Sequence, residues 1–300
     1  MSGTVRHDGA LATRVVATPC DGTIAYREFG AGDGSAVLAL HGTPGSREKF
    51  ALLDADARRL GLRIISPDRW GYGATPAPRH GSLAGFAEAY GGLMSSLGIS
   101  RYVVLGVSGG GPFATAMAAS QQPAIAALAL VSPVAPLVDE WGPVDGIGGF
   151  HKLSFLVLPR MPGANRVIFS AFRGVLGLSP ALALAVAQLR APAADRAIAA
   201  DPRNCRGQSD NYRAGLEGGV AGAVLDMQLF SRPWALDHAG IRVPSRLWLG
   251  SEDRNVPVAP AVALARQIPG CELELVTGAG HCWLACNQSV VLEWIRAAMR

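Results

Sequence analysis

The sequence predicts an α/β fold, in which a mostly parallel sheet is covered by helices and interrupted by a long helical insertion. From Val15 to Val131, short aliphatic runs alternate with longer helical stretches, and this alternation resumes at Ser245. Such a rhythm is typical of a parallel sheet. Residues 134–235 instead contain Ala/Leu-rich helical stretches broken by Pro and Gly, with no convincing strand. We therefore predict a core formed by residues 1–133 and 236–300, and an all-helical cap formed by residues 134–235.

The strands can be assigned in chain order. The first two are expected to form an antiparallel hairpin, at Thr13–Thr18 and Thr23–Phe29, because Asp21-Gly22 supplies a turn between them. The next four are near-continuous apolar runs ended by turn residues, as in strands that are buried on both faces. They are predicted at Ala36–Leu40, Arg63–Ser66, Tyr102–Val107 and Ile125–Val131, and two later strands at Ser245–Leu249 and Glu272–Val276.

Helices are expected between these strands, where the apolar residues follow a helical period. The predicted ranges are Arg47–Leu60, Leu83–Leu97, Gly109–Gln122, Ala259–Gln267 and Leu284–Met299.

Composition excludes several classes of protein. The 300 residues are 49% hydrophobic and only 17% charged, which excludes a disordered chain. No run of about 18 apolar residues is present, so no membrane span is expected. The net charge of +4 comes from scattered arginines, not from a basic run, which argues against a nucleic-acid partner. The N-terminus does not resemble a secretory signal, and the five cysteines are odd in number and sparse, so a cytoplasmic protein without a disulfide framework is expected.

The strongest chemical signal is the G-x-S-x-G pattern at Gly106–Gly110, between a predicted strand and a predicted helix. A sharp strand-to-helix turn holds its central residue in a strained, exposed conformation, and small neighbours prevent collisions with it. The start of the helix directs backbone N–H groups and a positive dipole toward the same place, which suits a developing anion. Ser108 is therefore the candidate nucleophile.

A serine hydroxyl needs a base, and that base needs an orienting acid. His281 follows the last predicted strand, and Asp253 follows the strand before it. The order Ser108, Asp253, His281 is the one expected for this architecture. Asp139 and Asp226 are alternatives for the acid, but Asp253 is preferred because Asn255-Val-Pro257 holds its loop in a fixed turn before a helix.

Two further loops follow strands. In His41–Gly45, the chain turns so that the N–H of Thr43 can point at the oxyanion of a tetrahedral intermediate, with the N–H of Gly109 as second donor. His41 is interpreted as a brace for this loop, not as the base. The loop Asp68–Gly73 is interpreted as a structural turn from which Trp70 or Tyr72 can line a pocket.

Together, these motifs resemble the α/β-hydrolase superfamily, in its branch of capped serine esterases and peptidase-like enzymes. The resemblance rests on His41-Gly-Thr-Pro-Gly45, Asp68-Arg-Trp-Gly-Tyr-Gly73, Gly106-Val-Ser-Gly-Gly110, Gly250-Ser-Glu-Asp253 and Gly280-His281, and covers almost the whole chain. It implies a mostly parallel eight-stranded sheet, a Ser-His-Asp triad and a helical cap after the sixth strand. It disfavours epoxide hydrolases and haloalkane dehalogenases, which use aspartate where this chain has Ser108. Gly109 departs from the pattern, since many relatives carry a bulkier residue there, and this departure predicts a wider or looser oxyanion region.

The insertion is expected to select the substrate, because in capped relatives it roofs the pocket. Candidates for substrate-binding residues are Trp70, Phe150, Phe155, Phe172, Met227, Phe230 and Trp283. Arginines are also concentrated in the insertion, either on solvated helix faces or to recognise an anionic substrate.

We therefore predict a serine hydrolase that cleaves a carboxylic ester, or a related acyl bond, in a small molecule with an apolar part. It would need no cofactor and no metal. Perhydrolysis is a possible side reaction of the same triad. One alternative is an aminopeptidase or amidase, for which Glu217 and Asp226 are the best acidic pair for a substrate ammonium group. Another is a ligand-binding receptor that keeps the triad but has negligible turnover.

Overall fold

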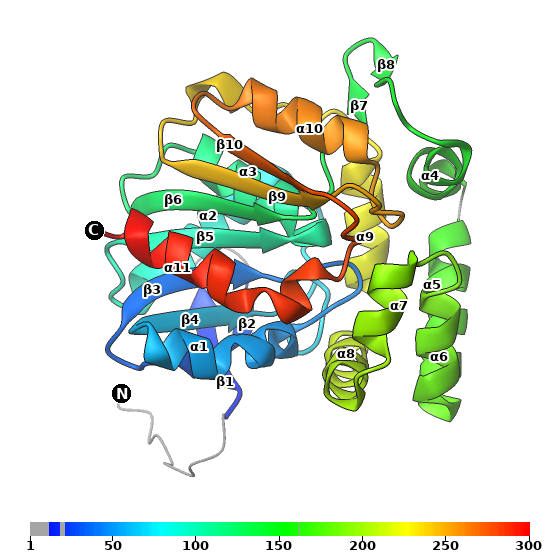
Figure 1. Cartoon of the computed structure of the whole chain (residues 1–300), viewed down its shortest axis with the longest axis horizontal. Coiled ribbons are helices and arrows are strands. Elements are labelled where there is room, and N and C mark those ends of the chain that lie inside the picture. Colours follow the sequence, from blue (N-terminus) through cyan, green and yellow to red (C-terminus); the bar gives the residue numbers. More distant parts are fainter. Residues whose placement is uncertain (1–11, 19–21, 162) are drawn as a thin grey trace.

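An eight-stranded sheet runs through the centre of the computed structural model, which describes residues 12–18, 22–161 and 163–300 (Figure 1). In spatial order, its strands are β1 (Arg14–Thr18), β2 (Gly22–Gly30), β4 (Leu62–Pro67), β3 (Ser35–Leu40), β5 (Tyr102–Val107), β6 (Ile125–Val131), β9 (Ser245–Gly250) and β10 (Glu272–Val276). Strand β2 is antiparallel to β1 and to β4, and the remaining pairs are parallel. The predicted mostly parallel sheet of eight strands is confirmed. The Asp21 position of the predicted hairpin turn lies outside the described residues.

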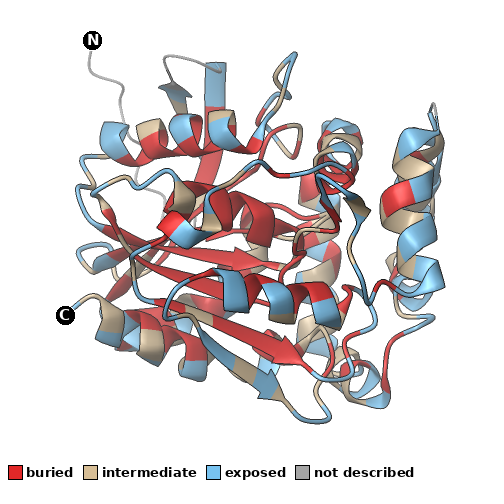
Figure 2. Ribbon diagram, turned by 90° about the horizontal axis from the view of Figure 1, so that it is seen from above, coloured by how far each residue is buried: buried red, intermediate tan, exposed pale blue. Residues whose placement is uncertain are grey.

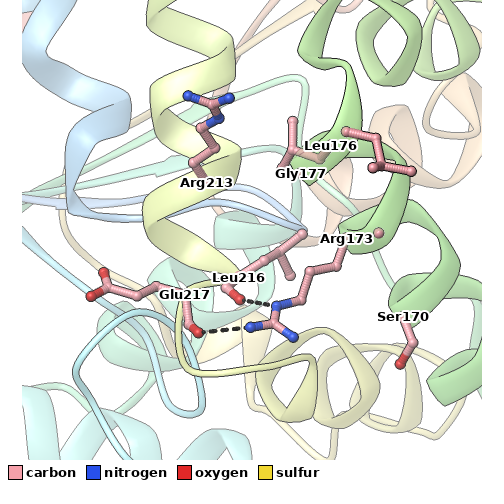
Figure 3. A pocket seen from close by; sticks show the side chains of 9 residues that line it. Ser170, Arg173, Leu176, Gly177, Arg213, Leu216 and Glu217 are labelled. Carbon is pink, nitrogen blue, oxygen red and sulfur yellow. Dashed lines mark hydrogen bonds between the residues drawn. The ribbon is translucent and has the colours of Figure 1, made fainter.

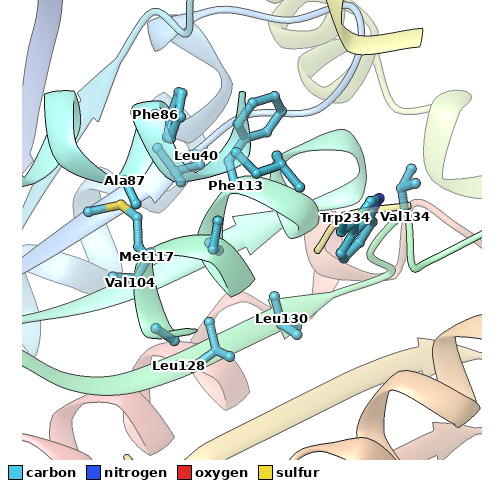
Figure 4. Close-up of a cluster of buried hydrophobic side chains, with 14 of the residues drawn as sticks. Leu40, Phe86, Ala87, Val104, Phe113, Met117, Leu128, Leu130, Val134 and Trp234 are labelled. Atoms are coloured by element: carbon cyan, nitrogen blue, oxygen red, sulfur yellow. The ribbon is translucent and has the colours of Figure 1, made fainter. Parts of the chain in front are cut away.

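Side chains of the central strands alternate between two buried faces, because successive residues of a strand point to opposite sides of the sheet. On one face, Leu128 and Leu130 of β6 join a large apolar cluster with Phe113, part of which is shown in Figure 4. On the other face, Ala129 and Val131 of the same strand join a second cluster. This double burial explains why the strands are near-continuous apolar runs. Figure 2 shows the buried residues concentrated in these strands.

Helices cover both faces of the sheet. The first cluster is closed by α2 (Leu83–Ser96), α3 (Gly111–Ala119) and α10 (Val258–Gln267), and the second by α1 (Asp54–Arg59) and α11 (Gln288–Ala298). Three predicted helices differ in detail. The stretch predicted at Arg47–Leu60 is a 3-10 helix, η1 (Arg47–Leu53), followed by α1; short 3-10 turns also precede α3 and α11, at η2 (Ser108–Gly110) and η6 (Trp283–Cys286).

The segment between β6 and β9, here called the insertion (residues 134–235), is mainly helical. Its elements are α4 (Gly149–Lys152), η3 (Leu153–Val157), η4 (Leu158–Arg160), α5 (Ala164–Leu178), α6 (Pro180–Ala187), α7 (Ala193–Ala199), α8 (Pro202–Gly215) and α9 (Ala221–Phe230). The prediction that it contains no strand is wrong, because β7 (Val138–Asp139) and β8 (Gly142–Pro143) form a short antiparallel hairpin. Two-residue strands are too short to show an alternating pattern in a sequence.

The insertion stands beside the edge of the sheet at which the parallel strands end (Figure 1). Since the carboxyl ends of parallel strands meet at one edge, the loops after β3, β4, β5, β9 and β10 gather there. Another 3-10 turn, η5 (His238–Gly240), lies between the insertion and β9. None of the helices in the described part of the chain has the length and apolar character needed to cross a membrane.

Candidate active site

Ser108 occupies the sharp turn between β5 and the helix that follows. Its φ angle is +54°, in the left-handed region that non-glycine residues rarely adopt, which agrees with the strained turn that the motif predicts. The carbonyl of Ser108 accepts a hydrogen bond of 2.9 Å from the N–H of Val134, the start of the insertion. The turn is therefore held from the neighbouring strand end, and its side chain stands at the edge of the sheet.

The structure brings Ser108, His281 and Asp253 together in a line. The Nε2 atom of His281 lies 2.9 Å from the Oγ atom of Ser108, and its Nδ1 atom lies 2.7 Å from Oδ2 of Asp253. The other carboxylate oxygen of Asp253 accepts the N–H groups of Asn255 and Val256, at 2.9 and 3.0 Å. The turn that follows Asp253 thus fixes this carboxylate, as its sequence indicated.

These contacts shift the titration of both groups. Burial alone would lower the pKa of His281, but the charge and hydrogen bond of Asp253, aided by the charge of Asp195, outweigh burial and raise the pKa above its ordinary value of 6.5. Burial would raise the pKa of Asp253, but His281 and the two backbone N–H groups hold it below its ordinary value. The arrangement therefore stabilises an imidazolium beside a carboxylate, which is the charge pair that a serine-activating base forms.

The loop after β3 lies against the Ser108 turn. A side chain on Gly109 would collide with the hydroxyl of Thr43, and its Cβ would lie 3.0 Å from the backbone nitrogen of Thr43. The threonine side chain therefore fills the space that a larger residue at position 109 would occupy. The expectation that Gly109 loosens the oxyanion region stays a prediction.

His41 braces this loop, as predicted. Its Nδ1 atom lies 2.8 Å from the carbonyl oxygen of Gly42, and its Nε2 atom accepts the N–H of Arg69 at 3.0 Å. Complete burial and the nearby charge of Arg69 lower the pKa of His41 well below its ordinary value, so the ring stays neutral.

A buried ion pair that sequence reasoning missed connects the insertion to the same loop. The guanidinium of Arg69 donates to both carboxylate oxygens of Asp226 on α9, at 2.6 and 2.7 Å, and also donates to the carbonyls of His41 and Gly42. Asp226 also accepts the hydroxyl groups of Tyr72 and Thr43. A single charged residue in the otherwise uncharged helix Ala221–Phe230 was the available signal, since an unpaired charge is almost never buried.

A second buried carboxylate of the insertion, Asp195 on α7, contacts the loop between β10 and η6. This loop, residues 277–282, carries the candidate base His281 and is here called the base loop. It accepts the consecutive N–H groups of His281 and Cys282, both at 2.8 Å. No motif marks Asp195 in the sequence, and only the glycine before His281 hints at a close approach. Burial raises the pKa of the Cys282 thiol to about 11, so this neighbour of the base remains protonated at neutral pH.

The structure does not bring the seven predicted substrate-binding residues together. Phe155 and Phe230 lie near each other, with ring centres 6.4 Å apart, and Met227 joins the same apolar cluster. Trp70 belongs to this cluster too, where it packs on Phe86 and Tyr90. The other three have separate surroundings: Phe172 packs on Tyr212, Phe150 lies under Arg190, and Trp283 lies in the cluster on the opposite face of the sheet. Helical spacing in a sequence does not show which of several apolar faces meets the site.

Arginines of the insertion line a surface hollow of about 590 Å³ between α5 and α8 (Figure 3). There, Arg173 donates to the carbonyls of Leu216 and Glu217, at 2.7 and 3.2 Å. The hollow contains none of the three aligned residues Ser108, His281 and Asp253. Arg173 therefore links α5 to the end of α8, and the hollow that it lines with Arg213 lies apart from the Ser108 site.

Comparisons with known proteins agree with this fold. The family model described as the alpha/beta hydrolase fold matches residues 35–284. The non-heme chloroperoxidase of Burkholderia pyrrocinia is 26% identical over 294 residues, covering 89% of this chain and 92% of the relative.

Two solved structures are similar in fold. A thermophilic esterase from Thermogutta terrifontis has a TM-score of 0.69 and 22% identity, covering 96% of this chain and 99% of its own. An epoxide hydrolase from Vigna radiata has a TM-score of 0.74 and 17% identity, covering 96% and 98%. Since these two proteins differ in the reaction that their names give, the shared fold does not choose the reaction. The match to the family model spans most of the chain, and the chain belongs to the alpha/beta hydrolase fold family.

Proposed function

We propose that this protein is a serine hydrolase that cleaves a carboxylic ester with an apolar part through an acyl-enzyme intermediate. The observation that carries the proposal is the line of hydrogen bonds from Ser108 through His281 to Asp253, at 2.9 and 2.7 Å, where the parallel strands end. Membership of the alpha/beta hydrolase fold family supports hydrolysis as the class of reaction.

In the proposed mechanism, Oγ of Ser108 attacks the ester carbonyl carbon while Nε2 of His281 accepts the hydroxyl proton. The tetrahedral intermediate collapses, His281 returns the proton to the departing alkoxide, and an acyl-serine remains. Water then attacks the acyl-serine with His281 again as base, which releases the acid and restores Ser108. Asp253 keeps the proton of the neutral ring on Nδ1, so that Nε2 is free to accept.

We assign the N–H groups of Thr43 and Gly109 to the oxyanion. Their proximity supports this assignment, because the Thr43 nitrogen borders the space beside Gly109, directly after the nucleophile. Donors fixed in advance by the fold stabilise the developing charge without reorganising, and the loss of one typically costs about 10²–10³ in rate.

We assign residues 134–235 to a cap that supplies the apolar part of the site. Support comes from the contact of Val134 with the Ser108 carbonyl, and from the apolar cluster that includes Val134, Leu156, Met227 and Phe230. Figure 4 shows Val134 and Trp234 among the residues of this cluster. An apolar acyl or alcohol group would bind there by removing its surface from water.

The aminopeptidase alternative loses its proposed acidic pair. Asp226 is buried and already pairs with Arg69, whereas Glu217 is exposed at the end of α8. A substrate ammonium group would have to replace a bidentate guanidinium at Asp226. The receptor alternative keeps the same triad, so that only a measurement of reactivity separates it from an enzyme.

The test is intact mass and labelling rate with a fluorophosphonate probe, applied to the wild type, Ser108→Ala, His281→Ala and a matched control, Ser132→Ala. Ser132 also has a positive φ and also directly follows a strand, but that strand is β6, and Ser132 is buried whereas Ser108 is half-buried. We expect one adduct on the wild type and on the control, none on Ser108→Ala, and labelling at least about 10⁴-fold slower in His281→Ala. An unlabelled but folded wild type would reject the hydrolase and favour the receptor. A panel of esters of increasing chain length then tests the apolar part.

The similarity to a protein named as a non-heme chloroperoxidase favours one second candidate, perhydrolysis. Here hydrogen peroxide replaces water as the nucleophile toward the acyl-serine, so that the products are a peracid and free Ser108. Peracid formation from a carboxylic acid or ester plus peroxide, lost in Ser108→Ala, is the expected result. Peracid formation that persists in Ser108→Ala would exclude this route.

A further inference from the structure

Asp195 connects the insertion to the base loop through two hydrogen bonds. The residue lies in α7, its side chain is 2% exposed, and His281 is 86 positions away in the sequence. Oδ2 accepts the N–H of His281 and Oδ1 accepts the N–H of Cys282, each at 2.8 Å. One carboxylate therefore holds two consecutive peptide groups, one of which belongs to the candidate base.

The base loop has a sequence that admits this carboxylate. A Cβ on Gly280 would overlap the carboxylate of Asp195, so glycine is the residue that allows the contact. The helix α7 also packs against η6, which directly follows the loop. The close contact therefore depends on two residues: α7 supplies the buried carboxylate of Asp195, and Gly280 of the base loop has no side chain to block it.

Asp195 has no cationic side chain as an ion-pair partner among the described residues. A buried carboxylate is costly unless hydrogen bonds or nearby charge compensate it. Here the two N–H groups supply that compensation, and a protonated His281 ring adds to it. The stability of the carboxylate and the placement of the base therefore depend on the same contact.

We propose that Asp195 is a positioning residue for His281: from the insertion, it fixes the backbone of the base loop so that the imidazole stays between Asp253 and Ser108. This inference rests on the proposed serine hydrolase. It makes α7 part of the catalytic arrangement, because a displacement of α7 would release the loop that carries the base.

The principal test compares Asp195→Asn with Asp210→Asn, an exposed acid on α8 of the same insertion. Asparagine keeps the shape, but one carboxylate oxygen becomes an NH₂ group that cannot accept an N–H. We expect fluorophosphonate labelling at pH 9 to be about 10- to 100-fold slower in Asp195→Asn, as for other small misplacements of a catalytic group. Asp210→Asn should label like the wild type. Equal labelling rates in Asp195→Asn and the wild type would overturn the proposal.

The pH profile separates positioning from a general loss of stability. The charged groups that act on His281 are Asp253, Asp195 and, in the opposite sense, Lys49 on η1. Loss of the negative charge of Asp195 should lower the pKa of His281, so that the acidic limb of the labelling profile moves to lower pH. An acidic limb that does not move in Asp195→Asn would count against the proposal.

Hydrogen exchange gives a readout that does not depend on reactivity. We expect faster amide exchange in the segment 278–286 in Asp195→Asn, and no change there in Asp210→Asn. If the wild type does not react with the probe, the proposed function fails, but this measurement still judges the contact. Unchanged exchange in the segment would then overturn the positioning role.

Gly280→Ala tests the contact from the other side and serves if Asp195→Asn folds poorly. Its added methyl group should slow labelling in the wild-type background. The same substitution should reduce the labelling rate much less in an Asp195→Ala background, where the colliding carboxylate is absent. Strictly additive effects would contradict a direct contact, because residues that touch are expected to couple.

Discussion

At the scale of single residues, the proposed function makes His281 the group that sets the pH range in which Ser108 can react. Its pKa is raised in the folded protein, because Asp253 and Asp195 outweigh the effect of burial. The protonated ring cannot accept the serine proton, so kcat/KM should fall as the pH decreases through a value above 6.5. The measurement is kcat/KM for a neutral ester between pH 5 and 9. An acidic limb centred below 6.5 would contradict the raised pKa of His281.

The same residues show why a sequence predicts some members of the candidate site and not others. Ser108, His281 and Asp253 directly follow strands, and the carboxyl edge of a parallel sheet brings strand ends together. Asp195 reaches the site from a short helix whose placement depends on tertiary packing. Its role therefore had no local signal.

At the scale of elements, α9 and the loop after β4 are held together by Arg69 and Asp226, both about 1% exposed. Asp226→Asn would leave the guanidinium buried without its charge partner. We expect a loss of about 3–5 kcal/mol in the free energy of unfolding, measured with urea. Replacement of both residues by apolar side chains of similar size should cost less than the single change, because no charge is then left buried.

The control for this prediction is Asp201→Asn at the start of α8. Its partner Arg203 is 90% exposed, and an exposed pair contributes little to stability. Equal destabilisation by the two substitutions would show that Asp226 acts as an ordinary surface charge.

The element boundaries predicted from the sequence agree closely with the structure in the sheet and less closely in the helices. Each of the eight strands begins and ends within one residue of its predicted bounds, because an aliphatic run ends sharply at turn residues. The stretch Arg47–Leu60 has a helical pattern, but the pattern does not distinguish η1 from α1, since both bury one face. The apolar helices of the insertion gave no direction for their faces, which is why Phe172 packs on Tyr212, away from the Ser108 site. Trp283 lies outside the insertion, in η6, and joins the cluster on the opposite face of the sheet.

At the scale of the whole molecule, stability depends on the two clusters that sandwich the sheet. Leu128 in β6 is fully buried, whereas Val15 in β1, at the edge of the sheet, is 57% exposed. Leu128→Ala should lower the free energy of unfolding by about 2–5 kcal/mol, through lost burial and the cavity left behind. Val15→Ala should change it by less than about 0.5 kcal/mol. Urea unfolding of both variants checks this difference, and similar losses would mean that the central strands do not dominate stability.

The two buried aspartates of the insertion also limit how this protein can be re-engineered. A chimera in which residues 134–235 were replaced by the corresponding segment of another protein would lose Asp226 and Asp195. The buried Arg69 guanidinium would then have no carboxylate partner, and the backbone N–H groups of His281 and Cys282 would have no acceptor. Such a graft would have to bring a carboxylate to each of these two points. On the proposed function, in which the insertion caps the site, new substrate preferences are therefore better sought by exchanging apolar side chains within residues 134–235 than by replacing the whole segment.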